Sequence, residues 1–357
     1  MSFSSPRLIC LSALLLITTS SVALAQHGVT GGGTIGGGTT KPATKPATTT
    51  PRRRTPTPVK RSATTSTVRK PTTTSADTYY QQAETLYTAK KYNEALDLYL
   101  KATEINPSMT AALYRMGWIY NELGDYPSAI DALKRVIASQ PNNAAAQFEL
   151  GYAHKKLDHY AEAVTAFSET VRISPNYTQA HYELGYALRN LGRYPETIQA
   201  YREAIRLDPN LALAHLGLGD VYYDNMKSYA EAADSYKRAL ELQPGNATAQ
   251  YRLGWCYNDL GRYAEAADEL RKAIQTTPNY PEAHNELGYA LNQLGRYQEA
   301  IQQYMIAIQQ RPNFGSAHYN LALTYLAVNN RNGALQQYRI LQRIDPTRAT
   351  KLFNQIR

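Results

Sequence analysis

Apolar residues recur at helical spacing through most of the chain. Leu184, Leu188 and Leu191 lie three or four positions apart, which predicts the buried stripe of one helix. Tyr201 and Ile205 continue this spacing further along and predict a second stripe. Each stripe covers only one face of its helix, so the two helices must bury these faces against each other or against neighbours.

Glycine and proline mark the ends of the two helices. Gly192 follows the first helix, where a residue without Cβ strain can end it. Pro195 stands at the beginning of the second helix, at a position that needs no backbone N–H. Pro209 ends this helix, because its ring would remove a hydrogen bond and clash with the preceding turn. Gly185 is small enough for two antiparallel helices to approach closely. The stretch therefore predicts a helix–turn–helix unit.

The same unit repeats at a fixed period. Eight prolines are spaced by 34 residues, with a single spacing of 35: Pro107, Pro141, Pro175, Pro209, Pro244, Pro278, Pro312 and Pro346. A period of this length indicates a solenoid of small supersecondary units, each of which leaves a face uncovered unless a neighbour stacks on it.

Two short motifs keep register with the prolines. Leu-Gly, as in Leu184-Gly185, recurs in the first helix, and Tyr-x-x-Ala, as in Tyr160 to Ala163, begins the second. The pattern resembles the tetratricopeptide repeat. The resemblance covers residues 76–348 as eight units that start at Ala76, Thr110, Ala144, Thr178, Ala212, Ala247, Pro281 and Gly315. It implies an all-α, right-handed superhelical solenoid that binds a protein or peptide partner.

Some units depart from the pattern. The first has Gln82-Ala83 in place of Leu-Gly, and the last has Arg331 at the tyrosine position, as expected where one side of a terminal unit meets solvent. The fifth has one extra residue between Asp224 and Tyr229, which predicts a longer turn between its helices. Residues 349–357 are amphipathic and predict a C-terminal capping helix.

Residues 1–25 have the pattern of a secretory signal peptide. A basic residue precedes an apolar run at 8–17, and Ala23 and Ala25 supply small residues at a cleavage position. The run is about half of the roughly 20 apolar residues that a membrane span needs. We therefore expect a mature chain that begins at Gln26, is exported to the periplasm or secreted, and has no transmembrane segment after cleavage.

Residues 26–75 are rich in Gly, Thr, Pro, Lys and Arg and contain no acidic residue. Such a composition cannot repay the entropy of ordering, so it predicts a disordered linker. A solvated spacer, a cationic tether to an anionic envelope surface and an O-glycosylated stalk all remain open.

The net charge of +9 belongs to this N-terminal part. Ten of the 38 basic residues and none of the 29 acidic residues precede residue 76, which leaves 28 basic against 29 acidic residues in the repeats. This balance disfavours nucleic acid as a partner of the repeat region.

No catalytic constellation is evident. His181, His215, His284 and His318 occupy the same position in different units, on the order of 16–20 Å apart for neighbouring helix pairs. A metal ion would need them within about 2 Å of one point. Cys256 lies in an apolar stripe, which favours a core role. We expect a non-enzymatic protein that holds no cofactor or metal.

Aromatic side chains gather on one side of the first helices. Positions five and nine of each unit, counted from its start, are four residues apart and share a helical face. The resemblance implies that this face lines a concave groove where ligands bind. The predicted partner-binding residues are the rings Tyr114, Trp118, Phe148, Tyr152, Tyr182, Tyr186, Tyr251, Trp255 and Tyr289 and the polar residues Lys155, Arg189, Asn258 and Asn292.

Two interpretations of this face remain open. The rings at position five are ordinary in such repeats and can pack between units, or they can form a recognition surface, because aromatic residues are favoured at binding hot spots. As a recognition surface they suit either a protein segment, bound by an exported scaffold, or a glycan or cell-wall polymer, bound together with the cationic linker.

Overall fold

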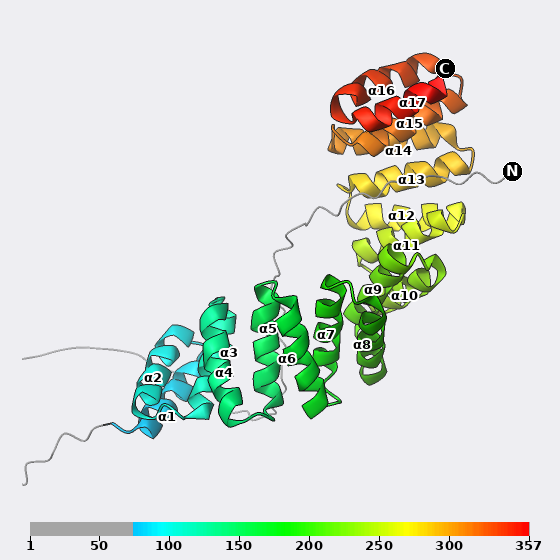
Figure 1. Ribbon diagram of the computed structural model, residues 1–357. Coiled ribbons are helices and arrows are strands. Elements are labelled where there is room, and N and C mark those ends of the chain that lie inside the picture. The colour runs from blue at the N-terminus through cyan, green and yellow to red at the C-terminus, as the bar shows by residue number, and fades with distance from the viewer. Residues whose placement is uncertain (1–73, 357) are drawn as a thin grey trace, which may run out of the picture. The chain divides into compact units, whose positions relative to one another are not determined.

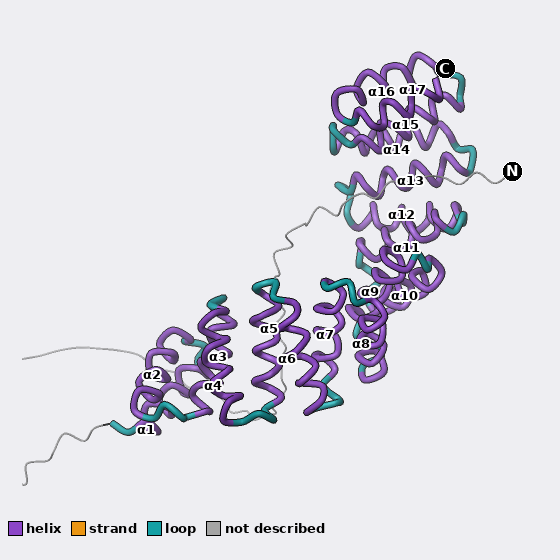
Figure 2. Tube along the Cα trace, in the orientation of Figure 1, coloured by secondary structure: helices purple, strands orange, loops and turns teal. Residues whose placement is uncertain are grey.

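The computed structural model describes residues 74–356, and this part of the chain is all-helical, without a strand (Figure 1 and Figure 2). The all-α class is therefore confirmed. The predicted signal peptide at 1–25 and almost all of the predicted linker at 26–75 lie outside the described residues. Within 74–356, no helix combines the length and the apolar composition required to cross a membrane.

Consecutive helices form antiparallel pairs that follow one another in chain order (Figure 1). The first helix of each pair begins where the 34-residue period predicts a unit to start. These first helices are α1 (Ala76–Thr88), α3 (Thr110–Leu123), α5 (Ala144–Lys156), α7 (Thr178–Asn190), α9 (Ala212–Asp220), α11 (Ala247–Asp259), α13 (Pro281–Gln293) and α15 (Gly315–Ala327).

Each second helix ends two residues before one of the periodic prolines, because the residue that precedes proline is excluded from the helical conformation. The second helices are α2 (Tyr92–Ile105), α4 (Tyr126–Ser139), α6 (Tyr160–Ile173), α8 (Tyr194–Leu207), α10 (Tyr229–Leu242), α12 (Tyr263–Thr276), α14 (Tyr297–Gln310) and α16 (Arg331–Ile344).

The turn inside each pair contains one residue in the left-handed conformation. Gly192 occupies this place after α7 with φ of 73°, as its position in the sequence predicts. Lys90, Asp158, Lys227 and Asn329 hold the same conformation with φ between 57° and 59°. A side chain disfavours this backbone by about 1–2 kcal/mol, so these four turns are less favourable than their glycine counterparts.

A glycine allows the two helices of a pair to approach closely. A Cβ atom built on Gly185 would lie 2.7 Å from the ring of Tyr201, which is buried in α8. Gly254 has the same relation to Leu270, whose Cγ atom would be 2.6 Å away. The predicted role of these glycines is confirmed, because any side chain there would displace the largest core residue of the second helix.

The extra residue of the fifth pair lies in a helix and not in the turn. A π-helical turn, η1 (Val221–Met226), continues α9, and Lys227 takes the left-handed position two residues before α10, as Gly192 does before α8. The prediction of a longer turn was wrong. A wider helical turn absorbs one residue and leaves the geometry of the tight turn unchanged.

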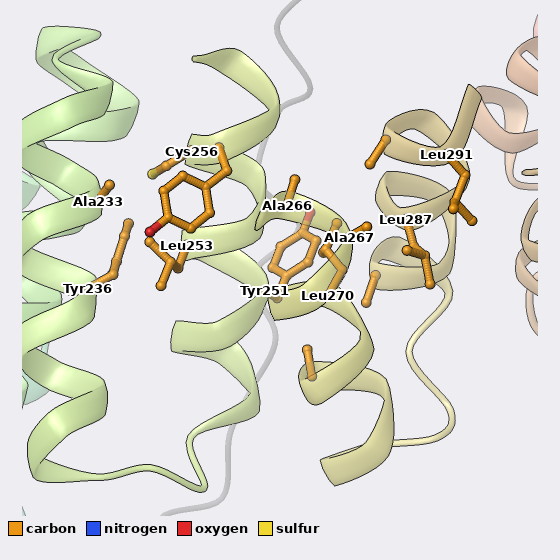
Figure 3. Packing of buried hydrophobic residues seen from close by; sticks show 14 of the residues in the cluster. Ala233, Tyr236, Tyr251, Leu253, Cys256, Ala266, Ala267, Leu270, Leu287 and Leu291 are labelled. Atoms are coloured by element: carbon orange, nitrogen blue, oxygen red, sulfur yellow. The ribbon is translucent and has the colours of Figure 1, made fainter. Parts of the chain in front are cut away.

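The buried apolar residues form several clusters along the stack. The largest runs from Tyr223 to Leu321 and takes side chains from the π-helical turn η1 and from α10 to α15, as Figure 3 shows for Tyr236, Leu253 and Leu270. Cys256 is fully buried in this cluster, and burial raises the pKa of its thiol to about 12. Its predicted core role is confirmed.

The last helix, α17 (Pro346–Ile356), begins three residues before the expected capping segment. It contacts both α15 and α16, and its residues Leu352 and Ile356 are buried against them. The helix therefore covers apolar surface that the last pair would otherwise expose.

Candidate functional site

First helices of neighbouring pairs touch one another: α3 contacts α5, α5 contacts α7, α11 contacts α13, and α13 contacts α15. Their side chains at positions two, five, six, nine, twelve and thirteen therefore form a shared surface, which we call the first-helix face. The predicted binding residues belong to it. Their individual contacts decide which of them a ligand can reach.

Position-twelve side chains bridge adjacent pairs. Lys155 Nζ lies 2.6 Å from a carboxylate oxygen of Glu183 at position six of the next pair, and both side chains are largely buried. Asn258 is 2% exposed and donates hydrogen bonds to the backbone oxygen and the carboxylate of Glu286. Asn292 donates to Thr324 Oγ1 at 2.6 Å. These polar groups hold repeats together, although the sequence suggested that they face a ligand.

Asn121 and Glu149 form a further bridge of this kind. Asn121 Nδ2 lies 2.8 Å from a carboxylate oxygen of Glu149. Burial raises the pKa of the Glu149 carboxyl to about 6, the hydrogen bond from Asn121 opposes the rise, and the nearby carboxylate of Glu122 adds to it. At neutral pH the carboxyl group of Glu149 is therefore ionised, although its buried environment disfavours the negative charge.

Two pairs carry an acidic residue instead of a ring at position nine, and other residues of the chain donate hydrogen bonds to both carboxylates. Asp220 accepts hydrogen bonds from the hydroxyl of Tyr236 at 2.7 Å and from Arg189 at 3.1 Å. Glu84 accepts two bonds from Arg115, at 2.9 and 3.1 Å, and one from the hydroxyl of a second-helix tyrosine. Glu84 precedes the row of rings, and Asp220 divides the row into two sets, at α3–α7 and at α11–α13.

In the first set, Trp118 is half-buried and packs edge-on against Tyr87 and Tyr92, with ring centroids 5.2 and 5.5 Å apart. Phe148 stacks on Tyr177 at 4.9 Å. Burial raises the pKa of the half-buried Tyr114 to about 12. These rings mainly pack against other rings.

Tyr152 and Tyr186 have a different environment, because cations cover their faces. Lys155 Nζ lies 4.8 Å from the centroid of the Tyr152 ring and 5.5 Å from that of Tyr186. Lys156 lies over Tyr152 at 5.2 Å, and Arg189 over Tyr186 at 5.6 Å. This arrangement brings together four predicted binding residues, namely Tyr152, Lys155, Tyr186 and Arg189.

A cavity of about 430 Å³ opens beside these residues. This volume lies within the range of ligand pockets. Its walls come from α5, α7, the turn after α5, and the beginnings of α6 and α9. The lining residues are Lys155, Lys156, Asp158, Tyr160, Gln179, Tyr182, Glu183, Tyr186 and Leu213.

The rings of the second set, at α11–α13, lie deeper in the protein than those of the first set. Tyr251 is 8% exposed, so it belongs to the core and offers little surface to a ligand. Trp255 is half-buried and packs on Tyr223 at 5.0 Å and on Tyr251 at 5.6 Å, with Arg252 over its ring. Tyr289 is half-buried and packs edge-on against a second-helix tyrosine at 6.2 Å.

Several lining residues of the cavity were absent from the predicted set. Tyr160 and Leu213 lie on the second helix of one pair and the first helix of another, and Gln179 is one residue from the start of α7. Gln179 and Leu213 stand at position two of their first helices, which belongs to the first-helix face, so the leucine at this position was the available signal.

The four equivalent histidines have structural contacts. The Nε2 atoms of His181, His215 and His318 each lie 2.8–3.2 Å from the carbonyl oxygen of the proline six residues earlier. His284 Nδ1 is 2.7 Å from the side-chain oxygen of Gln303. Each histidine thus links its first helix to the preceding turn or to its partner helix. Among the described residues, no three His, Cys, Asp or Glu side chains form a potential metal site.

The comparisons with known proteins agree with this architecture. Tetratricopeptide-repeat families match residues 80–144, 114–178 and 216–281, residues 185–225 and 288–329, and residues 258–305. Together the matched ranges cover more than half of the chain, which therefore belongs to the tetratricopeptide-repeat family. Proteins of this family are in general scaffolds for protein–protein interaction. No curated protein matches the sequence.

Solved structures show the same fold. The C-terminal part of a TPR repeat-containing protein from Cytophaga hutchinsonii is 19% identical, with a TM-score of 0.58 over 68% of this chain and 99% of that one. PilF of Pseudomonas aeruginosa is 19% identical, with a TM-score of 0.50 over 59% and 97%. YrrB, described as a TPR protein with an unusual peptide-binding site, is 26% identical, with a TM-score of 0.48 over 54% and 99%.

Proposed function

We propose that this chain is an exported, non-enzymatic scaffold of eight tetratricopeptide repeats, and that it binds an extended segment of a protein partner on the first-helix face at α5, α7 and α9. The cavity beside Tyr182 and Tyr186 is the observation that carries this proposal. It combines exposed apolar surface with hydrogen-bonding and charged groups, which is the composition of sites that hold a peptide in one orientation.

The contacts that the aromatic rings make within the chain favour a protein segment over a glycan as the ligand. A sugar binds to an aromatic side chain by covering the open face of the ring. The faces of Tyr152 and Tyr186 are occupied by cations, and Trp118 and Trp255 pack against tyrosines. A peptide does not need an open ring face, because it can bind the exposed apolar side chain of Leu213 and the exposed Lys156 that line the cavity.

Export is supported by the apolar run at 8–17 and the small residues Ala23 and Ala25. The test is N-terminal sequencing of the protein recovered from its host. We expect the recovered chain to begin at Gln26 and to be found in the periplasm or the medium. Recovery from the cytosol with residues 1–25 still attached would contradict export.

Site-specific photo-crosslinking in the host tests the binding function. A photoreactive residue at Asn190, exposed at the end of α7 one helical turn after the lining residue Tyr186, should form adducts with a protein. The same residue at Ser168, exposed on the second helix α6, is the matched control and should form none. Adducts with polysaccharide alone, or equal protein adducts from both positions, would contradict the proposal.

A further inference from the structure

The charges of the cavity are mostly paired within the protein. The ammonium group of Lys155 is bound to Glu183 at 2.6 Å, and Gln179 donates a hydrogen bond to the same carboxylate at 2.9 Å. The carboxylate of Asp158 accepts a hydrogen bond from the hydroxyl of Tyr160 at 2.6 Å. These contacts satisfy both acids that line the cavity.

Lys156 is the lining cation that remains. Its side chain is exposed, its ammonium group lies over the Tyr152 ring, and it forms no ion pair with any described residue. The ring holds the ammonium group near the cavity. An aromatic face does not neutralise the positive charge, so the ammonium group can still bind an anionic partner. A carboxylate is the complementary group.

An apolar side chain lines the same cavity. Leu213 is 50% exposed at position two of the fifth pair, although leucines are usually buried. The half-buried ring of Tyr182 lines the cavity with it, and burial raises the pKa of that tyrosine to about 12. Leu213 and Tyr182 together offer a patch that an aliphatic side chain of a ligand would cover.

We propose that this cavity recognises an acidic side chain next to an aliphatic side chain within an extended peptide, with the carboxylate bound by Lys156 and the aliphatic group packed on Leu213 and Tyr182. This inference rests on the proposed function and specifies its partner. An internal residue is favoured over a free C-terminus, because a terminal carboxylate needs several converging donors and the cavity has a single cation without an ion pair.

The test measures peptide affinity on the full chain by fluorescence anisotropy. The probe is a labelled nine-residue peptide with a central Glu-Leu, and its matched partners carry Gln-Leu, Lys-Leu or Glu-Ser. We expect the Glu-Leu peptide to bind about tenfold more tightly than the Gln-Leu peptide and the preference to weaken with salt. An amidated C-terminus should leave its affinity unchanged.

Variants of the chain locate the interaction. Lys156→Glu should weaken binding of the Glu-Leu peptide about tenfold and improve binding of the Lys-Leu peptide, whereas Lys134→Glu, the same charge change on the exposed side of α4, should do neither. Leu213→Asn should reduce the preference for Glu-Leu over Glu-Ser. All three side chains are exposed, so the fold should survive each change.

Several results would overturn the inference. Equal affinity for the Glu-Leu and Gln-Leu peptides, or equal effects of Lys156→Glu and Lys134→Glu, would show that Lys156 does not bind the carboxylate. If no peptide binds while Asn190 still forms protein adducts in the host, the proposed function stands and this preference is wrong. If both experiments fail, the two proposals fall together.

Discussion

The pairs α1–α8 and the pairs α9–α16 share one repeat but differ in how they are packed. In the C-terminal half, buried residues from Tyr223 to Leu321 form one continuous cluster, and a second cluster, from Ala322 to Ile356, joins α15, α16 and α17. In the N-terminal half, the core is divided among three smaller clusters, and a fourth joins α8 to α9. The difference suggests that the helices from α10 to α14 unfold as one cooperative unit and that the N-terminal half opens in smaller steps.

The two halves also differ in how their first-helix aromatic rings are packed. Around α11 and α13 the rings are set into the core, as Tyr251 and Trp255 show. Around α5 and α7 the rings of Tyr152 and Tyr186 carry cations beside an open cavity. Tight packing and most of the proposed binding surface thus lie in different halves, which is expected if binding surfaces come from less cooperative regions.

The largest expected effect comes from a matched pair of core substitutions. Leu133 and Leu270 are fully buried at equivalent positions, and each packs against the glycine of its first helix. Leu133→Ala and Leu270→Ala should each lower the free energy of unfolding by about 2–5 kcal/mol.

Hydrogen exchange should separate the two variants. Leu270→Ala should reduce protection from α10 to α14, and Leu133→Ala should do so only from α3 to α6, because the clusters differ in extent. Loss of protection over equally long stretches in both variants would contradict the proposed difference in cooperativity.

Asp220 joins the two halves, and its removal should have the next largest effect. Asp220→Ala leaves the buried hydroxyl of Tyr236 without its acceptor and Arg189 without its carboxylate, at a cost of about 1–3 kcal/mol. Urea unfolding followed by two probes, one in each half, should then show two separate transitions. Glu84→Ala breaks the matching clamp at the N-terminal end and should leave a single transition for α9–α16.

Glu149 makes the stability of the N-terminal half depend on pH. The pKa of its carboxyl is about 6 in the folded state and near 4.5 when unfolded, so its contribution to stability is present below pH 4.5 and is lost as pH rises through 6. Glu149→Gln removes the charge and should raise stability by about 1–2 kcal/mol at pH 8 and by little at pH 4.5. Glu104→Gln, an exposed change on α2, is the control; a gain that does not vary with pH would refute this account.

The smallest effect tests the turns. Lys90 holds a left-handed conformation with φ of 59°, so Lys90→Gly should raise the melting temperature, with a gain of about 1 kcal/mol. Gly192→Ala introduces the same strain at the equivalent turn and should lower stability by a similar amount. Equal and opposite shifts in thermal unfolding are expected, and a loss of stability in Lys90→Gly would count against the argument.

The repeat was predictable because each unit obeys the same constraints, so the start of every first helix followed from the spacing of the prolines. The π-helical turn was not predictable, since an added residue between Asp224 and Tyr229 can enter either the helix or the turn. The roles of Lys155 and Asn258 could not be predicted either. Their partners, Glu183 and Glu286, lie in the next pair, and the sequence does not give the angle between pairs.

The most direct test of the proposed binding surface is amide hydrogen exchange of the full chain with and without a saturating peptide. The account predicts slower exchange in α5, α7 and the beginnings of α6 and α9, with no change in α8 or the helices from α11 to α15. Slower exchange in the second helices other than the beginning of α6, or in the C-terminal half alone, would contradict it.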